Sequence, residues 1–265
     1  MRLVGIDAGT SFVKAAVFTG DGDLIATAAR PVPLDHPGPG QVEQDPAAVL
    51  RALRDILAEL DLSTVDLVAL TGQGDGCWLA DEAGEPVRPA VSWMDARGSE
   101  ALSRWESSNI VDEVYRIAGN ALFPGAQAAI LSWLDEHEPA SLDRAATAAY
   151  CKDLIFQRLT GIRVTDPSDS SLPFGDGASG YSQKVLELCG LDHRADLLAP
   201  IAAPLPVGAV DGGGSEFGLA EGIPVTDGPF DLPACAAGGG VREPGEGLLT
   251  IGTTLACQVL VDAVR

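Results

Sequence analysis

The chain has 265 residues, of which 46% are hydrophobic, and its formal net charge is -21. This length allows one large domain or two modest ones with a substantial core. The negative charge excludes nucleic acid and anionic membranes as general partners, because most of the surface would repel them. No apolar run approaches the roughly 18 residues of a membrane span. Met1 leads into a strand-like segment without a basic leader, so we expect a cytoplasmic protein.

Cysteine and histidine are scattered along the chain. The five cysteines are an odd number, and none lies in a CxxC pair or near a histidine cluster. This pattern indicates reduced thiols, with neither a disulfide framework nor a structural metal. The three histidines sit in polar stretches typical of surface loops or helix ends.

The chain opens with three strands and a glycine turn. Residues 3–6 are an apolar strand that runs into Asp7-Ala8-Gly9-Thr10-Ser11, and residues 13–18 and 24–28 continue as strands, which predicts a β-meander. A carboxylate at a strand end, followed by a glycine turn and hydroxyls, can hold magnesium-bound water and phosphate oxygens. A plain hairpin turn is the alternative, because such turns favour Asp and Gly.

A helix and several strands follow. Asp45-Pro46 begins a helix whose apolar residues keep a 3.6-residue period to Leu60, and residues 67–71 are a buried strand. Gln73-Gly74-Asp75 comes directly after that strand, and Trp93-Met94-Asp95-Ala96-Arg97 ends a later strand. Ligands bind at the carboxyl ends of strands in α/β sheets. Asp75, Asp95 and Gln73 can bind vicinal hydroxyls, and Arg97 can orient a carboxylate. Trp93 offers a flat apolar face, although Trp93 and Trp78 could equally be core aromatics.

The second half of the chain is helical and then loop-rich. Residues 99–159 are mainly helical, residues 165–180 form a Ser-, Asp- and Gly-rich loop, and residues 183–188 form a short helix. Residues 225–226 are a last short strand, and a helix over 233–237 follows Asp231. The Asp231 carboxylate is either the N-cap of this helix or a general base that removes a proton from a hydroxyl attacking a phosphate.

The chain closes with a hairpin. Residues 248–251 and 256–261 are its strands, around Gly252-Thr253-Thr254. Two hairpins with glycine and hydroxyl residues, one at each end of the chain, are what a nucleotide held between two related domains would require.

These motifs together resemble the FGGY family of carbohydrate kinases. They run in family order along almost the whole chain: Asp7-x-Gly9-Thr10-Ser11, Gln41-Val42-Glu43-Gln44-Asp45-Pro46, Thr71-Gly72-Gln73, Trp93-Met94-Asp95-Ala96-Arg97, Tyr150-Cys151-Lys152-Asp153, Leu159-Thr160-Gly161, Thr165-Asp166-Pro167-Ser168, Asp231 with Gly238, and Glu243-Pro244-Gly245 before Gly252-Thr253-Thr254.

The resemblance implies an α/β, actin-like fold with a ribonuclease-H-like mixed sheet flanked by helices. It implies ATP and Mg²⁺ as cofactors, a small sugar or polyol as substrate, and is compatible with a homodimer of the full-length protein. By the same resemblance Asp231 matches the catalytic base, which also contacts the substrate. The remaining roles are substrate contact for Gln73, Gly74, Asp75, Trp93, Asp95 and Arg97, phosphate or nucleotide binding for Asp7, Gly9, Thr10, Ser11, Gly252, Thr253 and Thr254, and magnesium binding through water for Asp7.

Departures from the family pattern bear on the substrate. Xylulokinases carry Gln-Met-His and glycerol kinases Gln-Arg-Glu where this chain has Gln73-Gly74-Asp75, and the polar residue that follows the base in the family is here Leu232. We expect Gly74 to open space, Asp75 to accept hydroxyl protons and Leu232 to remove a polar contact. An uncharged polyol, as for the erythritol kinases of the family, is therefore the first expectation, and a xylulose-type ketose is the alternative.

The resemblance also predicts the domain organisation. Residues 1–245 correspond to the N-terminal, sugar-binding domain and residues 246–265 to the first hairpin of the ATP-binding domain, of which a further ~200 residues would follow. We therefore expect the chain to bind sugar without efficient turnover. The alternatives are a non-catalytic sugar-binding or regulatory fragment, and an actin- or chaperone-like ATPase, against which the segments at Gln73 and Trp93 argue.

Overall fold

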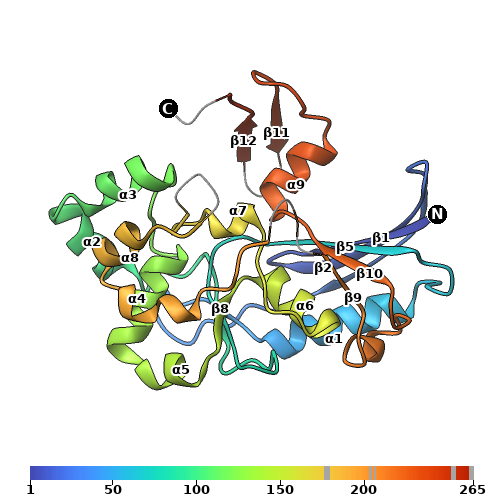
Figure 1. Cartoon of the computed structure of the whole chain (residues 1–265), viewed down its shortest axis with the longest axis horizontal. Helices are drawn as coiled ribbons and strands as arrows, with labels where there is room; N and C mark the ends of the chain where they lie inside the picture. Colours follow the sequence, from blue (N-terminus) through green and yellow to red (C-terminus); the bar gives the residue numbers. More distant parts are fainter. Residues whose placement is uncertain (176–179, 203–204, 206, 252–254, 263–265) are drawn as a thin grey trace.

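A six-stranded mixed sheet forms the centre of the computed structural model, which describes residues 1–175, 180–202, 205, 207–251 and 255–262 (Figure 1). Its strands, in spatial order, are β3 (Leu24–Pro31), β2 (Phe12–Thr19), β1 (Arg2–Ala8), β5 (Leu67–Gly72), β10 (Pro224–Asp227) and β9 (Val207–Ala209). The first three are antiparallel neighbours, which confirms the predicted meander, while β1, β5 and β10 run parallel. The carboxyl ends of these three strands therefore meet at one edge of the sheet.

Two helices pack on one face of this sheet. Helix α1 (Pro46–Ala58) begins as predicted, with the Asp45 carboxylate accepting a hydrogen bond from the Ala47 amide at 2.9 Å. Its buried apolar residues join those of α6 (Cys151–Thr160) and of alternate positions in β1 and β2 in one core. In β2, Val13, Ala15 and Val17 are buried and their neighbours point outward, as the two-residue period of a strand requires.

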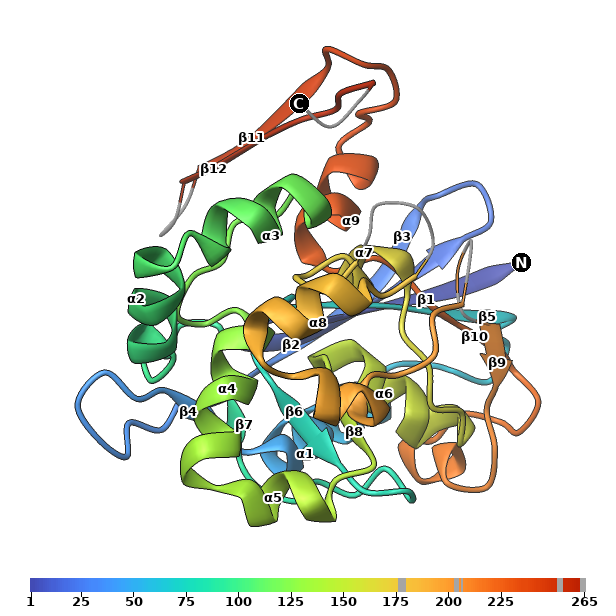
Figure 2. The same ribbon diagram turned by 60° about the vertical axis from the view of Figure 1, so that its left-hand side comes forward.

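A second core lies beside the sheet and is mostly helical (Figure 2). Here the prediction of helix through residues 99–159 needs a correction, because β8 (Thr147–Ala149) interrupts it and pairs with β6 (Trp78–Ala80). A three-residue strand carries no periodicity, so only its pairing partner reveals it. The other elements are α2 (Ser99–Ser107), α3 (Ile110–Ala118), α4 (Gln127–His137), α5 (Pro139–Arg144), α8 (Gln183–Cys189) and the pair β4 (Glu43–Gln44) and β7 (Ala90–Val91).

Short elements link the sheet to the last hairpin. They are α7 (Pro167–Ser170), the 3₁₀ turns η1 (Asp192–Leu197) and η2 (Gly214–Phe217), and α9 (Asp231–Gly238). Strands β11 (Gly247–Ile251) and β12 (Leu255–Val259) pair as predicted and stand beyond α9, away from the central sheet (Figures 1 and 2). None of the helices in the described part of the chain has the length and apolarity to cross a membrane.

Candidate functional site

A pocket of about 420 Å³ opens where β5 and β10 end. Because these two strands are parallel neighbours, the residues that follow them meet although they are far apart in sequence. The hairpin strand β12 contributes two lining residues. The lining residues are Gln73, Gly74, Asp75, Trp93, Phe123, Phe230, Asp231, Leu232, Leu255 and Ala256.

Asp75 is one of two carboxylates in this pocket. It has a φ of 55°, a left-handed conformation that Asp tolerates better than most residues. The next residue, Gly76, is also left-handed at 70°, and a Cβ there would lie 2.7 Å from the Val91 carbonyl oxygen, so only glycine fits. Burial raises the pKa of Asp75 to about 7, and a hydrogen bond from the Gln127 backbone amide opposes this rise. Near neutral pH the side chain can therefore donate or accept a hydrogen bond.

Asp231 is the second carboxylate, and it is the first residue of α9. The N-cap position belongs to Phe230, which makes no side-chain capping bond. The pKa of Asp231 is raised, mainly by burial and then by the charge of Asp7, while the Leu232 amide and Lys14 act in the opposite direction. A half-buried carboxylate with a raised pKa that faces a pocket is better suited to accept a proton than a solvated one.

Asp7, at the end of β1, is the expected magnesium residue. One oxygen, Oδ2, accepts a hydrogen bond from Lys14 Nζ at 3.2 Å, while Oδ1 is buried and has no hydrogen-bond partner. Such an orphan oxygen suits a cation or its bound water. Among the described residues no group of three or more His, Cys, Asp or Glu side chains could hold a metal. Magnesium would thus need water and phosphate oxygens as its other ligands, which is its usual preference.

Thr10 connects the expected phosphate segment to the expected substrate segments. Its hydroxyl donates to Gln73 Oε1 at 3.2 Å and accepts from Trp93 Nε1 at 2.9 Å. Gln73 Nε2 in turn donates to Gln44 Oε1 at 2.8 Å. The only hydroxyl proton of Thr10 is therefore used in a hydrogen bond within the protein. A phosphate bound at this turn would need hydrogen-bond donors from other groups. The Gly9 amide closes the turn on the Phe12 carbonyl at 3.0 Å, and Ser11 is exposed.

The two tryptophans have different environments. Trp78 is 2% exposed and belongs to the sheet core, whereas Trp93 is 36% exposed and lines the pocket. The core alternative is therefore confirmed for Trp78 alone. The hydrogen bond to Thr10 fixes the indole of Trp93 as part of the pocket wall.

Asp95 and Arg97 lie in a buried ion-pair cluster and not among the lining residues. The Asp95 carboxylate accepts the Val42 amide at 2.6 Å, and Arg97 donates to both of its oxygens, with Nε at 2.9 Å from Oδ1. Arg97 also pairs with Glu43 at 2.8 Å and stacks over the Trp133 ring. Asp95 and Arg97 thus find their hydrogen-bond and ion-pair partners within the protein. Their role is to hold in place the segment that carries Trp93.

Four lining residues of the pocket were missed by the sequence analysis: Phe123, Phe230, Leu255 and Ala256. Gly252, Thr253 and Thr254 lie outside the described residues. Phe230 could have been found, because it directly precedes the expected base. Phe123, Leu255 and Ala256 carry no sequence signal, since apolar residues in a loop or an edge strand do not indicate what they face.

A buried charge cluster includes Asp227, the last residue of β10, the strand that precedes Asp231 in the chain. Lys152 Nζ lies 2.7 to 3.1 Å from carboxylate oxygens of Asp153, Asp166, Asp169 and Asp227, all buried. Burial raises the pKa of Asp169 and of Asp227. Burial would lower the pKa of Lys152, but the four carboxylates outweigh it and raise that pKa. The cluster joins α6, the α7 turn and the end of β10.

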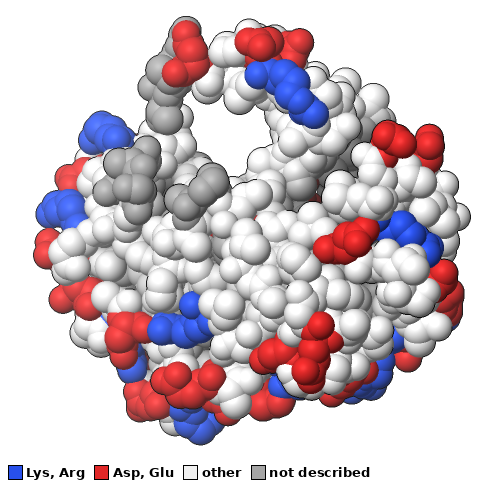
Figure 3. All heavy atoms as spheres, turned by 45° about the vertical axis from the view of Figure 1, so that its right-hand side comes forward, with Lys and Arg blue, Asp and Glu red and all other residues white. Residues whose placement is uncertain are grey.

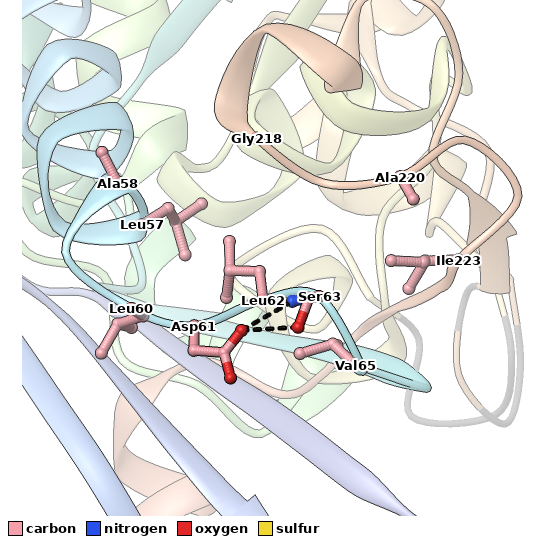
Figure 4. Close-up of a pocket in the computed structure, with 10 residues that line it drawn as sticks. All are labelled: Leu57, Ala58, Leu60, Asp61, Leu62, Ser63, Val65, Gly218, Ala220 and Ile223. Carbon is pink, nitrogen blue, oxygen red and sulfur yellow. Dashed lines mark hydrogen bonds between the residues drawn. The ribbon is translucent and has the colours of Figure 1, made fainter.

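A second hollow, of about 480 Å³, lies away from the site, between the end of α1 and the segment after η2 (Figure 4). Its walls are mostly apolar, and the Asp61 carboxylate there accepts from the Ser63 amide and hydroxyl. It contains none of the expected site residues. Figure 3 shows an opening near the top of the molecule and, below it, a face where uncharged side chains predominate, with charged side chains of both signs most numerous toward the lower edge.

Comparison with known proteins assigns the chain to a family. Residues 2–238 match the family model for the N-terminal domain of the FGGY family of carbohydrate kinases. The chain belongs to this family. Its fold is accordingly the actin-like α/β fold of the sugar kinases, as predicted.

Relatives of this FGGY chain include an erythritol kinase and xylulose kinases. It is 36% identical to the erythritol kinase of Brucella abortus over 95% of the chain and 51% of that protein. Identity to the xylulose kinase of Escherichia coli is 29%, over 95% of the chain and 52% of that protein. The crystal structure of a xylulose kinase from Rhodospirillum rubrum superposes with a TM-score of 0.92 at 28% identity, covering 100% of this chain and 57% of that one. The chain thus spans about half the length of the curated relatives it matches.

One expectation drawn from the FGGY pattern is wrong. Gly74 does not open space in the pocket, because the ring of Phe230 fills it. A Cβ added at Gly74 would lie 2.8 Å from Phe230 Cδ2 and 2.9 Å from Cγ. The sequence alone could not reveal this packing, since the two residues follow different strands.

Proposed function

We propose that this chain is the carbohydrate-binding half of a kinase that uses ATP and Mg²⁺ to phosphorylate a hydroxyl group of a small polyol or ketose. The observation that carries the proposal is the pocket in which Asp75 and Asp231 face a cavity of about 420 Å³ at the carboxyl ends of β5 and β10. The 36% identity to an erythritol kinase favours a polyol over a ketose.

The residues of the pocket suggest a division of work. Asp231, with its raised pKa, would accept the proton of the attacking hydroxyl. Asp75 would bind another hydroxyl of the substrate, as donor or acceptor. Trp93 would supply a flat face for the carbon chain. These contacts hold the reacting hydroxyl in place, and positioning contributes a large part of phosphoryl-transfer catalysis.

Asp7 is the residue we assign to magnesium, through its buried and unpartnered Oδ1. When bound, MgATP supplies the phosphoryl group and neutralises its charge. Lys14, 3.2 Å from Asp7 Oδ2, would limit the local negative charge at this edge of the sheet. The hairpin strands β11 and β12 are proposed to begin the second, nucleotide-binding domain, with the boundary at residues 245–246.

The test is phosphoryl transfer by the longest natural form of the protein, with MgATP and a panel of polyols and ketoses that includes erythritol, xylulose and glycerol. We expect transfer to at least one small polyol or ketose. Stimulated ATP hydrolysis without any phosphorylated carbohydrate would instead favour an ATPase, and binding without transfer would favour a regulatory sugar-binding protein. Product analysis by mass spectrometry distinguishes these outcomes.

A further inference from the structure

The close packing of Phe230 on Gly74 is the least expected feature of the pocket wall. Gly74 has no left-handed φ, so its backbone does not demand glycine. Space demands it, because a Cβ would lie 2.8, 2.9 and 3.3 Å from three carbons of Phe230. Contacts below 3 Å between carbon atoms are strongly repulsive, and the nearest carbons of Phe230 belong to the stiff part of its side chain. With Phe230 in this position, no side chain fits at residue 74.

Phe230 is also held firmly through its backbone. Its amide donates to Ser168 Oγ of α7 at 3.1 Å, and the carbonyl of Pro229 accepts from Thr71 Oγ1 of β5 at 2.7 Å. The next residue is Asp231. The backbone that carries the ring is therefore tied to α7 and β5 and is continuous with the residue that we assign as the base.

The chemistry of this wall bears on which ligands fit. Phe230, Phe123, Leu232 and Leu255 give the pocket an apolar lining around its two carboxylates. A polyol carries a hydroxyl on every carbon. A hydroxyl that faces an aromatic ring loses its hydrogen bond to water and gains none from the protein. A short polyol can satisfy its hydroxyls at the polar groups, whereas each added carbon brings one more hydroxyl toward the apolar wall.

We propose that Phe230, through its packing on Gly74, is a specificity-determining residue that limits the pocket to short linear polyols and selects four carbons over five. This inference rests on the proposed function. It assigns to Phe230 a role in choosing the substrate that is separate from the proton transfer assigned to Asp231.

The test uses calorimetric binding of erythritol and xylitol to this chain, with the intrinsic tryptophan fluorescence, to which the pocket residue Trp93 contributes, as a second signal. We expect the native chain to bind erythritol about ten-fold more tightly than xylitol, the order expected for one unsatisfied hydroxyl. Phe230→Ala should bring the two affinities within about three-fold of each other. Phe230→Leu, which keeps an apolar side chain, should fall between the native chain and the alanine variant.

Gly74→Ala tests the packing itself. It should weaken binding of both ligands, and the double variant Gly74→Ala/Phe230→Ala should recover erythritol binding relative to Gly74→Ala alone. Tyr115→Ala is the control, because it removes an exposed aromatic ring on α3 that does not line the pocket, and it should keep the native preference for erythritol. Circular dichroism checks that each variant is folded.

The outcomes separate the two proposals. An unchanged ratio in Phe230→Ala, or an equal shift in Tyr115→Ala, would overturn the role of Phe230 and leave the proposed function standing. A native chain that binds neither erythritol, xylitol nor xylulose would contradict the proposed function and this inference together.

Discussion

Asp231 is the residue on which the proposed chemistry depends. It faces the pocket, lies near Asp7 and has a pKa raised mainly by burial. Asparagine has nearly the same shape but cannot accept the proton. In the longest natural form of the protein, we therefore expect Asp231→Asn to lower kcat about 10²- to 10⁴-fold while substrate affinity, measured by calorimetry, changes little. Asp192→Asn, at an exposed carboxylate in η1, is the control. Full activity of Asp231→Asn would show that another group takes the proton.

Asp75 should make stability depend on pH. Its pKa rises from 3.8 in the unfolded chain to about 7 in the fold, so the folded state binds more protons between these values. Stability from this group is therefore fully present below about pH 4 and is lost as the pH rises through 7. Asp75→Asn keeps the neutral form and the left-handed backbone.

We expect Asp75→Asn to remove this decline and to raise the free energy of unfolding at pH 8 by on the order of 2 kcal/mol relative to its effect at pH 4, because each pKa unit corresponds to about 1.4 kcal/mol and the pocket is partly solvated. Urea unfolding at the two pH values measures it. A difference between variant and native chain that is the same at both pH values would contradict the raised pKa.

Gly125 packs directly against the backbone of Trp93. A Cβ at this position would lie 1.7 Å from the Trp93 carbonyl oxygen, so the backbone of one segment would have to move. We expect Gly125→Ala to destabilise the fold by about 2–3 kcal/mol and to shift the intrinsic tryptophan fluorescence, to which Trp93 contributes. Gly238→Ala is the matched control, because nothing lies within 4 Å of its Cβ and α9 accepts alanine. Equal melting temperatures for the two variants would contradict this close approach.

At the scale of elements, the Lys152 cluster holds together the parts that carry the base. Four carboxylates, from α6, the α7 turn and the end of β10, surround one ammonium group. The hydroxyl of Ser168 in α7 accepts a hydrogen bond from the amide of Phe230. The positions of α7 and β10 therefore set the position of Phe230 and of the start of α9, which lines the pocket.

We expect Lys152→Met to destabilise the chain by roughly 3–5 kcal/mol at pH 7, because removing one partner leaves buried carboxylates without compensation. The loss should shrink at lower pH, where protonation of Asp169 and Asp227 relieves the repulsion. Lys184→Met, at an exposed lysine on α8, should change stability by less than about 0.5 kcal/mol. Urea unfolding measures the stability of both variants. Similar losses in the two would show that Lys152 does not compensate the charge of the buried carboxylates.

At the scale of the whole molecule, charge is the dominant property. The chain has 38 acidic and 17 basic side chains, and like charges repel one another across the compact state. Screening weakens this repulsion, since the Debye length falls from about 10 Å at 0.1 M to about 3 Å at 1 M salt. Ligands that carry phosphate must also approach against this net charge.

We therefore expect the melting temperature to rise by several degrees between about 0.1 M and 1 M NaCl. Sucrose serves as the control, because it stabilises proteins without screening charge. Substituting a few exposed glutamates by glutamine should reduce the salt effect. A melting temperature that falls with salt would show that the ion pairs of this surface outweigh its net repulsion.

The sequence by itself determined the local elements and the family. The two-residue period of the opening strands, the 3.6-residue period of α1 with its Asp45 cap, and the glycine-punctuated segments at strand ends are short-range signals that do not need the rest of the fold. The ordered motifs were enough to identify the FGGY family. They also located Asp75, Trp93 and Asp231, which the pocket brings together.

Only the tertiary structure decided what these residues touch. The parallel pairing of β5 and β10 brings Asp75 to Asp231, and the same pairing sets Phe230 against Gly74, so that a glycine expected to open space is covered by a ring. Asp95 and Arg97 are engaged with each other and with Glu43, and Thr10 with Gln73 and Trp93. The physical reason is that side-chain packing and the sharing of hydrogen bonds are set by neighbours distant in sequence, which no local pattern encodes.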